Sequence, residues 1–477
     1  MFTNDFSDSN HSRKPGTSRR QFAKRCLAMA GASASSAWLQ LEMAESLVAA
    51  GPGEGYRALV CLFLGGGNDS FNMLMPNETS EYTDYSTARG GTGAGGLAIP
   101  QSNLLPIGDV TGRSFGLHPS MTQLRTLYNA GEVAFVANVG SLVEPVDKAI
   151  FEAYDNRLPL GLFSHADLAR QWQTAMPRSR DDITGWGGRM ADILTDPSRR
   201  FDPIALSIAI DSTNLFQAAT YANPYIVGAG GTEERDGYFS EWSRDRIFRA
   251  AHEKMLARNE QNLVKRTHSL MTKQAIEAAL TYNAATANVT LATVFPETYL
   301  GQQMERIART IAAHESLDHN RQTFFVNYGN WDLHGDLLGP HAANLAEVDA
   351  ALAAFYASMV ELGLADCVTT FTASDFGRTL AGNGQGSDHG WGGNQIVMGG
   401  GVNGGRIYGD YPLSLAPGSP LDVGRGRLIP TVSVDQYAAE LSMWFGIGNN
   451  ADLETILPNI RKFYSTGASG TPLGMFS

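Results

Sequence analysis

Three short apolar segments of the chain each end in polar residues that include an aspartate. These segments and their aspartates are residues 58–64 before Asp69, residues 323–328 before Asp332, and residues 367–372 before Asp375. Apolar runs of this length that stop abruptly are typical of buried parallel strands. Ligands of open α/β sheets bind beyond the carboxyl ends of the strands, so we expect the three aspartates to lie where a site forms.

Amphipathic segments separate the apolar runs. Residues 120–130 predict a helix with Met121, Leu124, Leu127 and Tyr128 on one face, and residues 133–139 predict the strand that follows it. A second strand is expected at 204–210, and further helices are expected at 189–194, 297–314, 342–362 and 435–445. The order strand, helix, strand favours a mostly parallel sheet with crossover helices.

Residues 240–290 form a helix-rich segment that interrupts this alternation. Charged side chains lie on one face, with Trp242, Ile247, Met255 and Leu263 among the apolar positions. We interpret the segment as a helical insertion whose Lys and Arg side chains are solvated. No internal repeat and no long linker requires a second domain after residue 51.

Histidines follow two of the expected strand ends closely. His334 lies two residues after Asp332, His341 follows seven residues later, and His389 follows Asp388 in the loop beyond Asp375. Carboxylate oxygens suit hard cations, and imidazole adds affinity for zinc-like or manganese-like ions. The pattern indicates a metal site, and the alternative is a glycine-rich turn with a capping Asp and a surface His.

The charge of the chain disfavours polyanionic partners. Its formal net charge is −12, and residues 1–50 carry six basic and four acidic side chains, so the remainder has a charge of −14. A globular protein this acidic is a poor candidate for binding nucleic acid or an anionic membrane.

The N-terminal 50 residues resemble an export signal. Residues 18–24, SRRQFAK, form a twin-arginine signature, and the Ala/Ser-rich run at 26–41 is too short and too weakly apolar for a stable membrane span. Small residues at Ala44 and 48–50 offer cleavage sites. We expect export in folded form by the twin-arginine machinery to the periplasm or beyond; a cytosolic amphipathic helix is the alternative.

Two of the three cysteines lie in the predicted strands. Cys61 and Cys367 each precede a strand-end aspartate by eight residues, which predicts neighbouring but unbonded thiols. Free buried cysteines act as small hydrophobic side chains.

Four motifs carry a family resemblance. The sequences LFLGGGNDSFN, NWDLHGD, SDFGRT and DHGWGG, between about residues 57 and 447, resemble the DUF1501 family, which is similar to the alkaline phosphatase and sulfatase superfamily. The resemblance implies a three-layer α/β/α sandwich over residues 51–477, with a two-metal site at the strand ends.

The resemblance also implies roles for individual residues. One metal would bind Asp332, His389 and either His334 or His341, and the other would bind Asp69, Asp375 and a nucleophile. Ser164, at the start of a short helix, fits the nucleophile, although it also fits an ordinary helix N-cap. Asp388 would hold the His389 ring, Arg378 would hold an anionic substrate, and His165 is either a further ligand or a surface residue.

These roles suggest a secreted metal-dependent hydrolase of phosphate or sulfate esters, using zinc, manganese or calcium on small anionic esters. The alternative is a non-catalytic, metal-stabilised protein for binding or assembly. Phe376 stands where superfamily members carry a histidine after the aspartate. The chain has no Cys-x-Pro-x-Arg motif, so a formylglycine sulfatase is not expected.

Overall fold

A computed structural model describes residues 55–476, apart from residues 155, 198–203, 223, 233–239, 259–260 and 468. The expected export signal at residues 1–50 lies outside the described residues. Residues 51–477 form one unit of the chain, and the elements described here belong to it.

A nine-stranded sheet forms the centre of this unit. Its order is β13-β5-β12-β9-β1-β8-β6-β7, with β14 also pairing with β5. Among the described strands of this central sheet, β12 alone runs antiparallel to its neighbours, so the sheet is mostly parallel as predicted. The strands are β1 (Arg57–Leu64), β5 (Val133–Gly140), β6 (Ser207–Ile210), β7 (Tyr225–Val227), β8 (Arg321–Tyr328), β9 (Val368–Ser374), β12 (Gly393–Gly399), β13 (Ile407–Tyr408) and β14 (Val432–Ser433).

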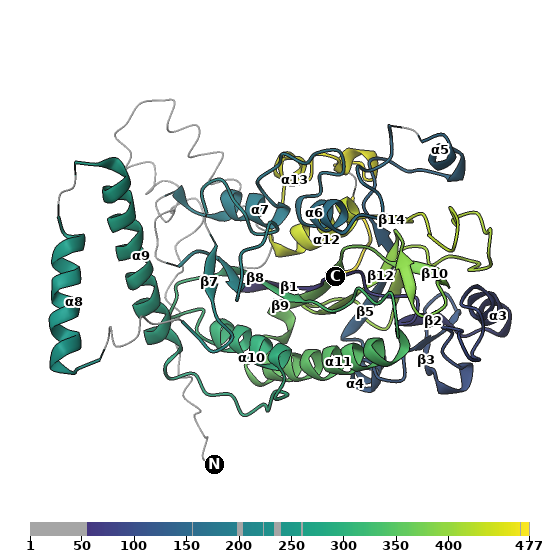
Figure 1. Ribbon diagram of the computed structural model, residues 1–477, viewed down its shortest axis with the longest axis horizontal. Coiled ribbons are helices and arrows are strands. Elements are labelled where there is room, and N and C mark those ends of the chain that lie inside the picture. The colour runs from purple at the N-terminus through teal and green to yellow at the C-terminus, as the bar shows by residue number, and fades with distance from the viewer. Residues whose placement is uncertain are drawn as a thin grey trace, which may run out of the picture. The chain divides into compact units, whose positions relative to one another are not determined.

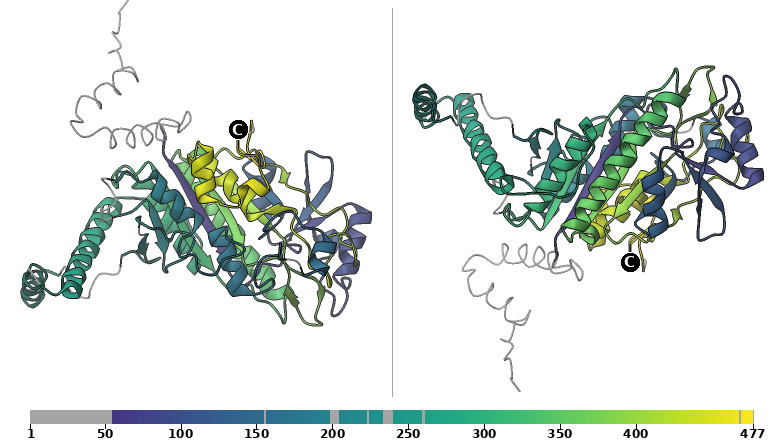
Figure 2. Two further views of the ribbon diagram at one scale, coloured as in Figure 1. Left: turned by 90° about the horizontal axis from the view of Figure 1, so that it is seen from above. Right: turned by 90° about the horizontal axis from the view of Figure 1, so that it is seen from below.

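Helices cover both faces of the sheet (Figures 1 and 2). Alternate residues of β1 belong to two separate cores, with Val60 and Leu62 in one and Cys61 and Phe63 in the other. Successive side chains of a strand point to opposite faces of the sheet, so this alternation means that β1 is buried on both faces. One core includes α4 (Thr122–Ala130), α10 (Tyr299–Ala312) and α11 (Leu338–Glu361), and the other includes α6 (His165–Thr174), α7 (Trp186–Leu194), α12 (Val434–Phe445) and α13 (Asn450–Ile456). The three-layer α/β/α prediction is confirmed.

Smaller elements complete the described part of the chain. One small sheet has the order β2-β4-β3, and a two-stranded sheet pairs β10 with β11. Their bounds are β2 (Leu74–Pro76), β3 (Leu105–Gly108), β4 (Ser114–Leu117), β10 (Arg378–Gly382) and β11 (Ser387–His389). Two short helices are α3 (Thr79–Ala88) and α5 (Lys148–Glu152), and 3-10 turns lie at Gln101–Asn103, Ala365–Cys367 and Ile460–Lys462.

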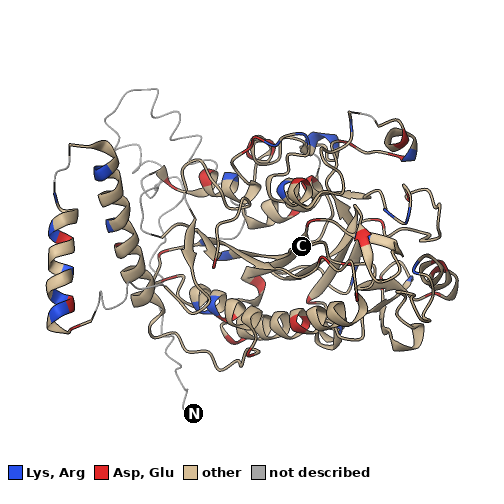
Figure 3. Ribbon diagram, viewed as in Figure 1, with Lys and Arg blue, Asp and Glu red and all other residues tan. Residues whose placement is uncertain are grey.

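Two helices, α8 (Ser243–Leu256) and α9 (Leu263–Thr286), lie in the interval read as an insertion. Residues 240–287 carry eight Lys or Arg and five Asp or Glu, and the basic side chains recur along both helices (Figure 3). The buried Tyr282 of α9 shares a hydrogen bond of 2.6 Å with Thr310 of α10, which attaches the pair to the helices of the sheet.

The central strands end at the same level. Leu64 of β1 is paired with Tyr328 of β8 and with Ser374 of β9, so the segments that follow these strands leave the sheet together. This register is the reason that Asp332 and Asp375, far apart in the chain, reach one region.

The same register makes one cysteine prediction wrong. Cys61 is paired with Phe371, whereas Cys367 lies before the first residue of β9. An offset of four residues at about 3.3 Å per residue separates the thiols by roughly 13 Å along the strands. Both cysteines are free, as predicted, but they are not neighbours.

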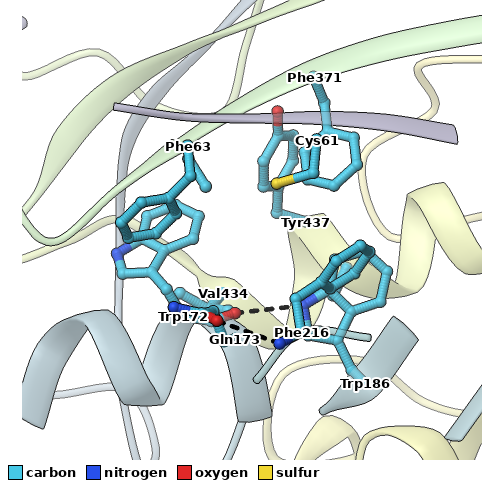
Figure 4. A pocket seen from close by; sticks show the side chains of 11 residues that line it. Cys61, Phe63, Trp172, Gln173, Trp186, Phe216, Phe371, Val434 and Tyr437 are labelled. Atoms are coloured by element: carbon cyan, nitrogen blue, oxygen red, sulfur yellow. Dashed lines mark hydrogen bonds between the residues drawn. The ribbon is translucent and has the colours of Figure 1, made fainter. Parts of the chain in front are cut away.

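Cys61 instead lines a small aromatic cavity between the sheet and its helices (Figure 4). Trp172, Trp186 and Tyr437 line it from the helices, and the Trp186 indole donates to the Trp172 carbonyl at 3.1 Å. Burial raises the pKa of the Cys61 thiol, so this cysteine stays protonated and inert.

Within the described residues, no helix has the length and apolar character needed to cross a bilayer.

Candidate metal centre

Four separate segments meet beyond the ends of the central strands. Asp332 and His334 follow β8, Asp375 follows β9, Asp388 and His389 lie on β11, and His165 is the first residue of α6. The loop after β1 passes close beneath them through Gly66. An added Cβ at Gly66 would lie 2.6 Å from the Asp332 backbone nitrogen, and its φ of +114° also favours glycine.

Three imidazole nitrogens converge on one carboxylate oxygen. The Nε2 atoms of His165, His334 and His389 lie 3.4, 3.0 and 3.5 Å from Asp332 Oδ1. The Nε2 atom of His389 also lies 3.1 Å from that of His165 and 2.8 Å from that of His334. Each of the three Nε2 atoms therefore lies within 3.5 Å of Asp332 Oδ1.

The opposite nitrogen of each ring faces an oxygen. His165 Nδ1 lies 2.6 Å from Asp375 Oδ2, His334 Nδ1 lies 3.1 Å from Asp388 Oδ1, and His389 Nδ1 lies 2.7 Å from the Phe163 carbonyl. A carboxylate or carbonyl oxygen can only accept, so each Nδ1 donates its proton. In a neutral ring the lone pair is then on Nε2, which is how proteins orient histidine ligands of metals.

The spacing of these atoms suits a small divalent cation. Bonds of about 2.0–2.1 Å to nitrogen or oxygen in a tetrahedron place neighbouring ligand atoms about 3.3 Å apart. Ligand atoms of His165, Asp332 and His389 lie within 4.8 Å of one another, and their closest approaches are 3.1, 3.4 and 3.5 Å. His334 lies beside this group, with its Nε2 atom 3.0 Å from Asp332 Oδ1 and 2.8 Å from His389 Nε2.

His389 and Asp332 are in the protonation states that metal binding needs. Burial lowers the pKa of His389, which favours its neutral ring, although the Phe163 hydrogen bond acts in the other direction. Partial burial alone would raise the pKa of Asp332, but Arg378 and the neighbouring histidines outweigh it, so this pKa is below its ordinary value. Asp332 is therefore ionised near neutral pH.

Arg378 does not have the role predicted for it. Its side chain has no exposed surface; it donates to Asp332 Oδ1 through two nitrogens at 3.1 Å and to the Gly66 carbonyl at 2.8 Å. Further bonds join it to Ser387 and Trp331. Because the guanidinium is buried and its donors are taken up by these bonds, Arg378 orients Asp332 and is not available to a substrate.

Asp388 also differs from its predicted role. It accepts from His334 rather than from His389, whose ring is held by the Phe163 carbonyl. Burial acts to raise the pKa of Asp388, but bonds from Asn383, Arg425 and His334 outweigh it and lower the pKa to about 2.

Asp375 supports His165 through its Oδ2 atom, which also accepts from the Gly66 backbone at 3.3 Å. Burial raises its pKa, and the His165 bond opposes that rise. Phe376, at the position where a histidine was expected, packs its ring 4.7 Å from His165 and 4.8 Å from His389. The space for a second histidine is thus filled by an apolar ring, and α6 supplies the imidazole instead.

Asp69 and His341 contact other groups than those of the centre. Asp69 forms a buried ion pair with Arg89, and His341 is buried with its Nε2 atom 3.0 Å from Asn68 Oδ1. Burial lowers the pKa of His341 to about 3, so this ring is neutral. The sequence placed both residues among the ligands because they follow strand ends, but their side chains point into the protein. The ligand geometry of the described residues thus favours one ion rather than two.

Ser164 is the N-cap of α6, and its hydroxyl accepts from the Asp167 backbone at 3.5 Å. It directly precedes His165 and follows the Phe163 carbonyl that holds His389. The cap role considered for this residue is thus present in the structure.

His165 is the functional residue that the sequence left undecided. No apolar strand-like run with a terminal aspartate precedes it, and the signal available was its place at a helix start beside a candidate serine. The centre is reachable from solvent, since the side chains of Asp332 and His334 are 49% and 44% exposed.

The structure is an α/β/α fold with a cluster of histidine and aspartate side chains beyond the strand ends. A model of the family described as "Protein of unknown function (DUF1501)" matches residues 56–414, and the chain belongs to this family. Comparison with curated proteins gave no match.

Solved structures with a similar chain path include three proteins from different organisms. A protein in the alkaline phosphatase superfamily from Vibrio parahaemolyticus has 10% identity and a TM-score of 0.32, covering 83% of this chain and 68% of its own. PsFucS1 sulfatase from Pseudoalteromonas sp. has 10% identity and a TM-score of 0.30, with 77% and 68% covered. The lipoteichoic acid synthase LtaP from Listeria monocytogenes has 7% identity and a TM-score of 0.31, with 86% and 81% covered. Similarity at this level carries no information about activity.

Proposed function

We propose that this protein is a metal-dependent hydrolase of phosphate or sulfate esters whose ion is held by Asp332, His165, His334 and His389. One observation carries the proposal: three imidazoles donate from Nδ1 to oxygen acceptors and aim their Nε2 lone pairs at one carboxylate oxygen. Three lone pairs and an anion repel one another unless a cation lies between them.

Three histidines and one aspartate favour zinc or manganese over calcium, which prefers oxygen ligands. A bound divalent ion would supply positive charge against the charge that develops on the oxygens of an ester, and it would lower the pKa of a coordinated water.

The protein's own residues would fix the geometry of the reaction. Arg378 holds Asp332, Asp375 holds His165, and Asp388 holds His334, so each ligand is oriented before substrate arrives. Phe376 excludes water from one side of the centre, while Asp332 and His334 leave the other side open to an ester. Hydrolysis needs a coordination position for water or the ester, which the bound ion would gain by taking a fifth ligand on the exposed side.

The test combines metal analysis with an ester panel. Dialysed protein should bind about one equivalent of zinc or manganese with submicromolar affinity, and the loaded form should hydrolyse 4-nitrophenyl phosphate or 4-nitrophenyl sulfate. A chelator should abolish turnover, and re-addition of the metal should restore it. Metal binding without turnover on any phosphate or sulfate ester would favour the binding or assembly role instead.

We also propose that the protein is exported in folded form by the twin-arginine route. The Arg19-Arg20 pair before an uncharged Ala/Ser-rich run supports this proposal. Folded export would let the centre acquire its metal before the protein leaves the cytoplasm.

Replacing both arginines by lysine should retain the precursor in the cytoplasm, because the export machinery discriminates against lysine at this pair. Cell fractionation with an antibody against residues 51–477 measures the outcome. A doubly substituted protein that still reaches the periplasm would remove the twin-arginine assignment.

A further inference from the structure

We infer that Arg425 and Arg427 form an anion subsite beside the metal centre, which binds the sulfate or phosphate group of the ester. The inference rests on the proposed function for the identity of the ester, while its structural basis is independent of the metal.

Both arginines contact residues of the centre from one short loop. Arg425 Nη1 lies 2.5 Å from Asp388 Oδ2, the carboxylate that also holds His334. Arg427 Nε donates to the His389 carbonyl at 3.1 Å, and its guanidinium lies 4.7 Å from the centre of the Phe163 ring. The two cations are thus fixed next to two of the proposed ligands.

The loop that carries them has a defined and strained backbone. Arg425 has a φ of +62°, between Gly424 and Gly426, which also have positive φ. A left-handed conformation is costly for a residue with a side chain and is found mainly where the surroundings enforce it. Here it directs a long basic side chain toward Asp388.

A buried carboxylate maintains this conformation. Asp422 is 4% exposed and accepts backbone N–H bonds from Gly418, Gly424 and Gly426 at 2.7 to 2.8 Å. The carbonyls of Arg425 and Gly426 accept from Ala381 and Leu380 of β10, each at 3.1 Å. Because β10 begins at Arg378, the loop and the metal centre are parts of one hydrogen-bonded unit.

The local charges favour an anion. Asp332, Asp375, Asp388 and Asp422 of the loop stand against three arginines, Arg378, Arg425 and Arg427, when the histidines are neutral. A divalent cation would therefore leave the centre with an excess of about one positive charge, which a bound anion can neutralise. Of the three arginines, Arg378 is fully buried, whereas the Arg425 side chain is 45% exposed and can reach a ligand.

The two guanidiniums also disfavour each other. Like charges that the protein holds close together repel each other. Two cations held together by the protein are stabilised when an anion lies between them, and a guanidinium matches the oxygens of sulfate or phosphate well.

The experiment measures binding of inorganic phosphate and of inorganic sulfate to the zinc-loaded protein by titration calorimetry. Arg425→Gln and Arg427→Gln should each weaken binding about tenfold, because a hydrogen bond between charged groups contributes about 1.4 kcal/mol or more. Zinc content should stay at the wild-type level. Arg461→Gln, which removes an exposed arginine paired with Glu454 at 2.7 Å, is the control and should bind as wild type.

Turnover separates the subsite from the metal. The KM for 4-nitrophenyl phosphate or sulfate should rise in the two variants, and it should stay at the wild-type value in the Arg461→Gln control. Arg425→Lys and Arg427→Lys keep the charge and should restore part of the affinity. The ion that loses more affinity identifies the preferred ester.

Phosphate and sulfate affinities within twofold of wild type in both Gln variants, with zinc retained, would overturn the subsite and leave the proposed function intact. If Arg425→Gln also loses zinc through Asp388 and His334, Arg427→Gln decides alone. A wild-type protein without zinc affinity would defeat the proposed function, and the arginine dependence of phosphate binding could still be measured on the metal-free protein.

Discussion

Replacing His389 by alanine should lower zinc affinity by about 100-fold or more. Loss of a residue that only supports a ligand typically lowers metal affinity 10- to 100-fold, and His389 is placed to be a ligand itself. Its Nε2 atom lies between those of His165 and His334, so its removal opens the middle of the cluster. Zinc titration against a competing chelator measures the change.

The same variant should lose metal-dependent stability. At a zinc concentration 100 times the wild-type Kd, binding stabilises the folded state by about 2.7 kcal/mol, and the variant should not gain this. Without metal, the free energies of unfolding of the two proteins should differ by only about 1 kcal/mol, which is the contribution of the lost hydrogen bond to the Phe163 carbonyl.

His268→Ala removes an exposed histidine of α9 and serves as the matched control for both measurements. It should bind zinc as the wild type does. Equal zinc affinity of the His389→Ala protein and this control would show that the histidine cluster is not a metal site.

The sequence was sufficient to predict the architecture because burial on two faces gives strong local signals. The apolar runs at 58–64 and 323–328 have the length and the continuous apolar character of strands that are buried on both faces. They form β1 and β8 in the structure. The one antiparallel strand, β12, was not distinguishable, because its short run has the same composition as a parallel strand.

The site was predictable only in part, because residue type and position along the chain do not determine side-chain direction. Asp332 and Asp375 were predicted from the strand ends and do meet there, whereas Asp69 also follows a strand but turns inward to Arg89. The β1 strand ends at Leu64, five residues before Asp69, and the intervening glycine-rich turn leads to a buried position where Asp69 pairs with Arg89.

Pairings between distant segments were not accessible from the sequence either. The partner of each histidine depends on which loops pack together: Asp388 is adjacent to His389 in sequence but bonds to His334. His165 enters the centre because α6 begins there, and that position follows from the packing of α6 against the sheet.

The last prediction concerns Ser164, which we propose as the nucleophile. Residues 163–165 are fixed at the centre from both sides, since the Phe163 carbonyl binds His389 and the His165 ring binds Asp375. Phe163 has a φ of +69°, and strain of this kind at a non-glycine residue is concentrated at functional sites. The N-terminus of the ten-residue α6 would stabilise an ionised hydroxyl.

Ser164→Ala should therefore retain zinc and reduce ester turnover by about 10³-fold or more, because no covalent intermediate can form. Its stability should fall by about 1 kcal/mol, which is the contribution of an N-cap. Thr298→Ala removes the hydroxyl cap of α10, which accepts from Gly301 at 3.1 Å, and is the matched control. That control should show a similar loss of stability and wild-type turnover. Turnover that survives in the Ser164→Ala protein would exclude Ser164 as the nucleophile and indicate direct attack by water.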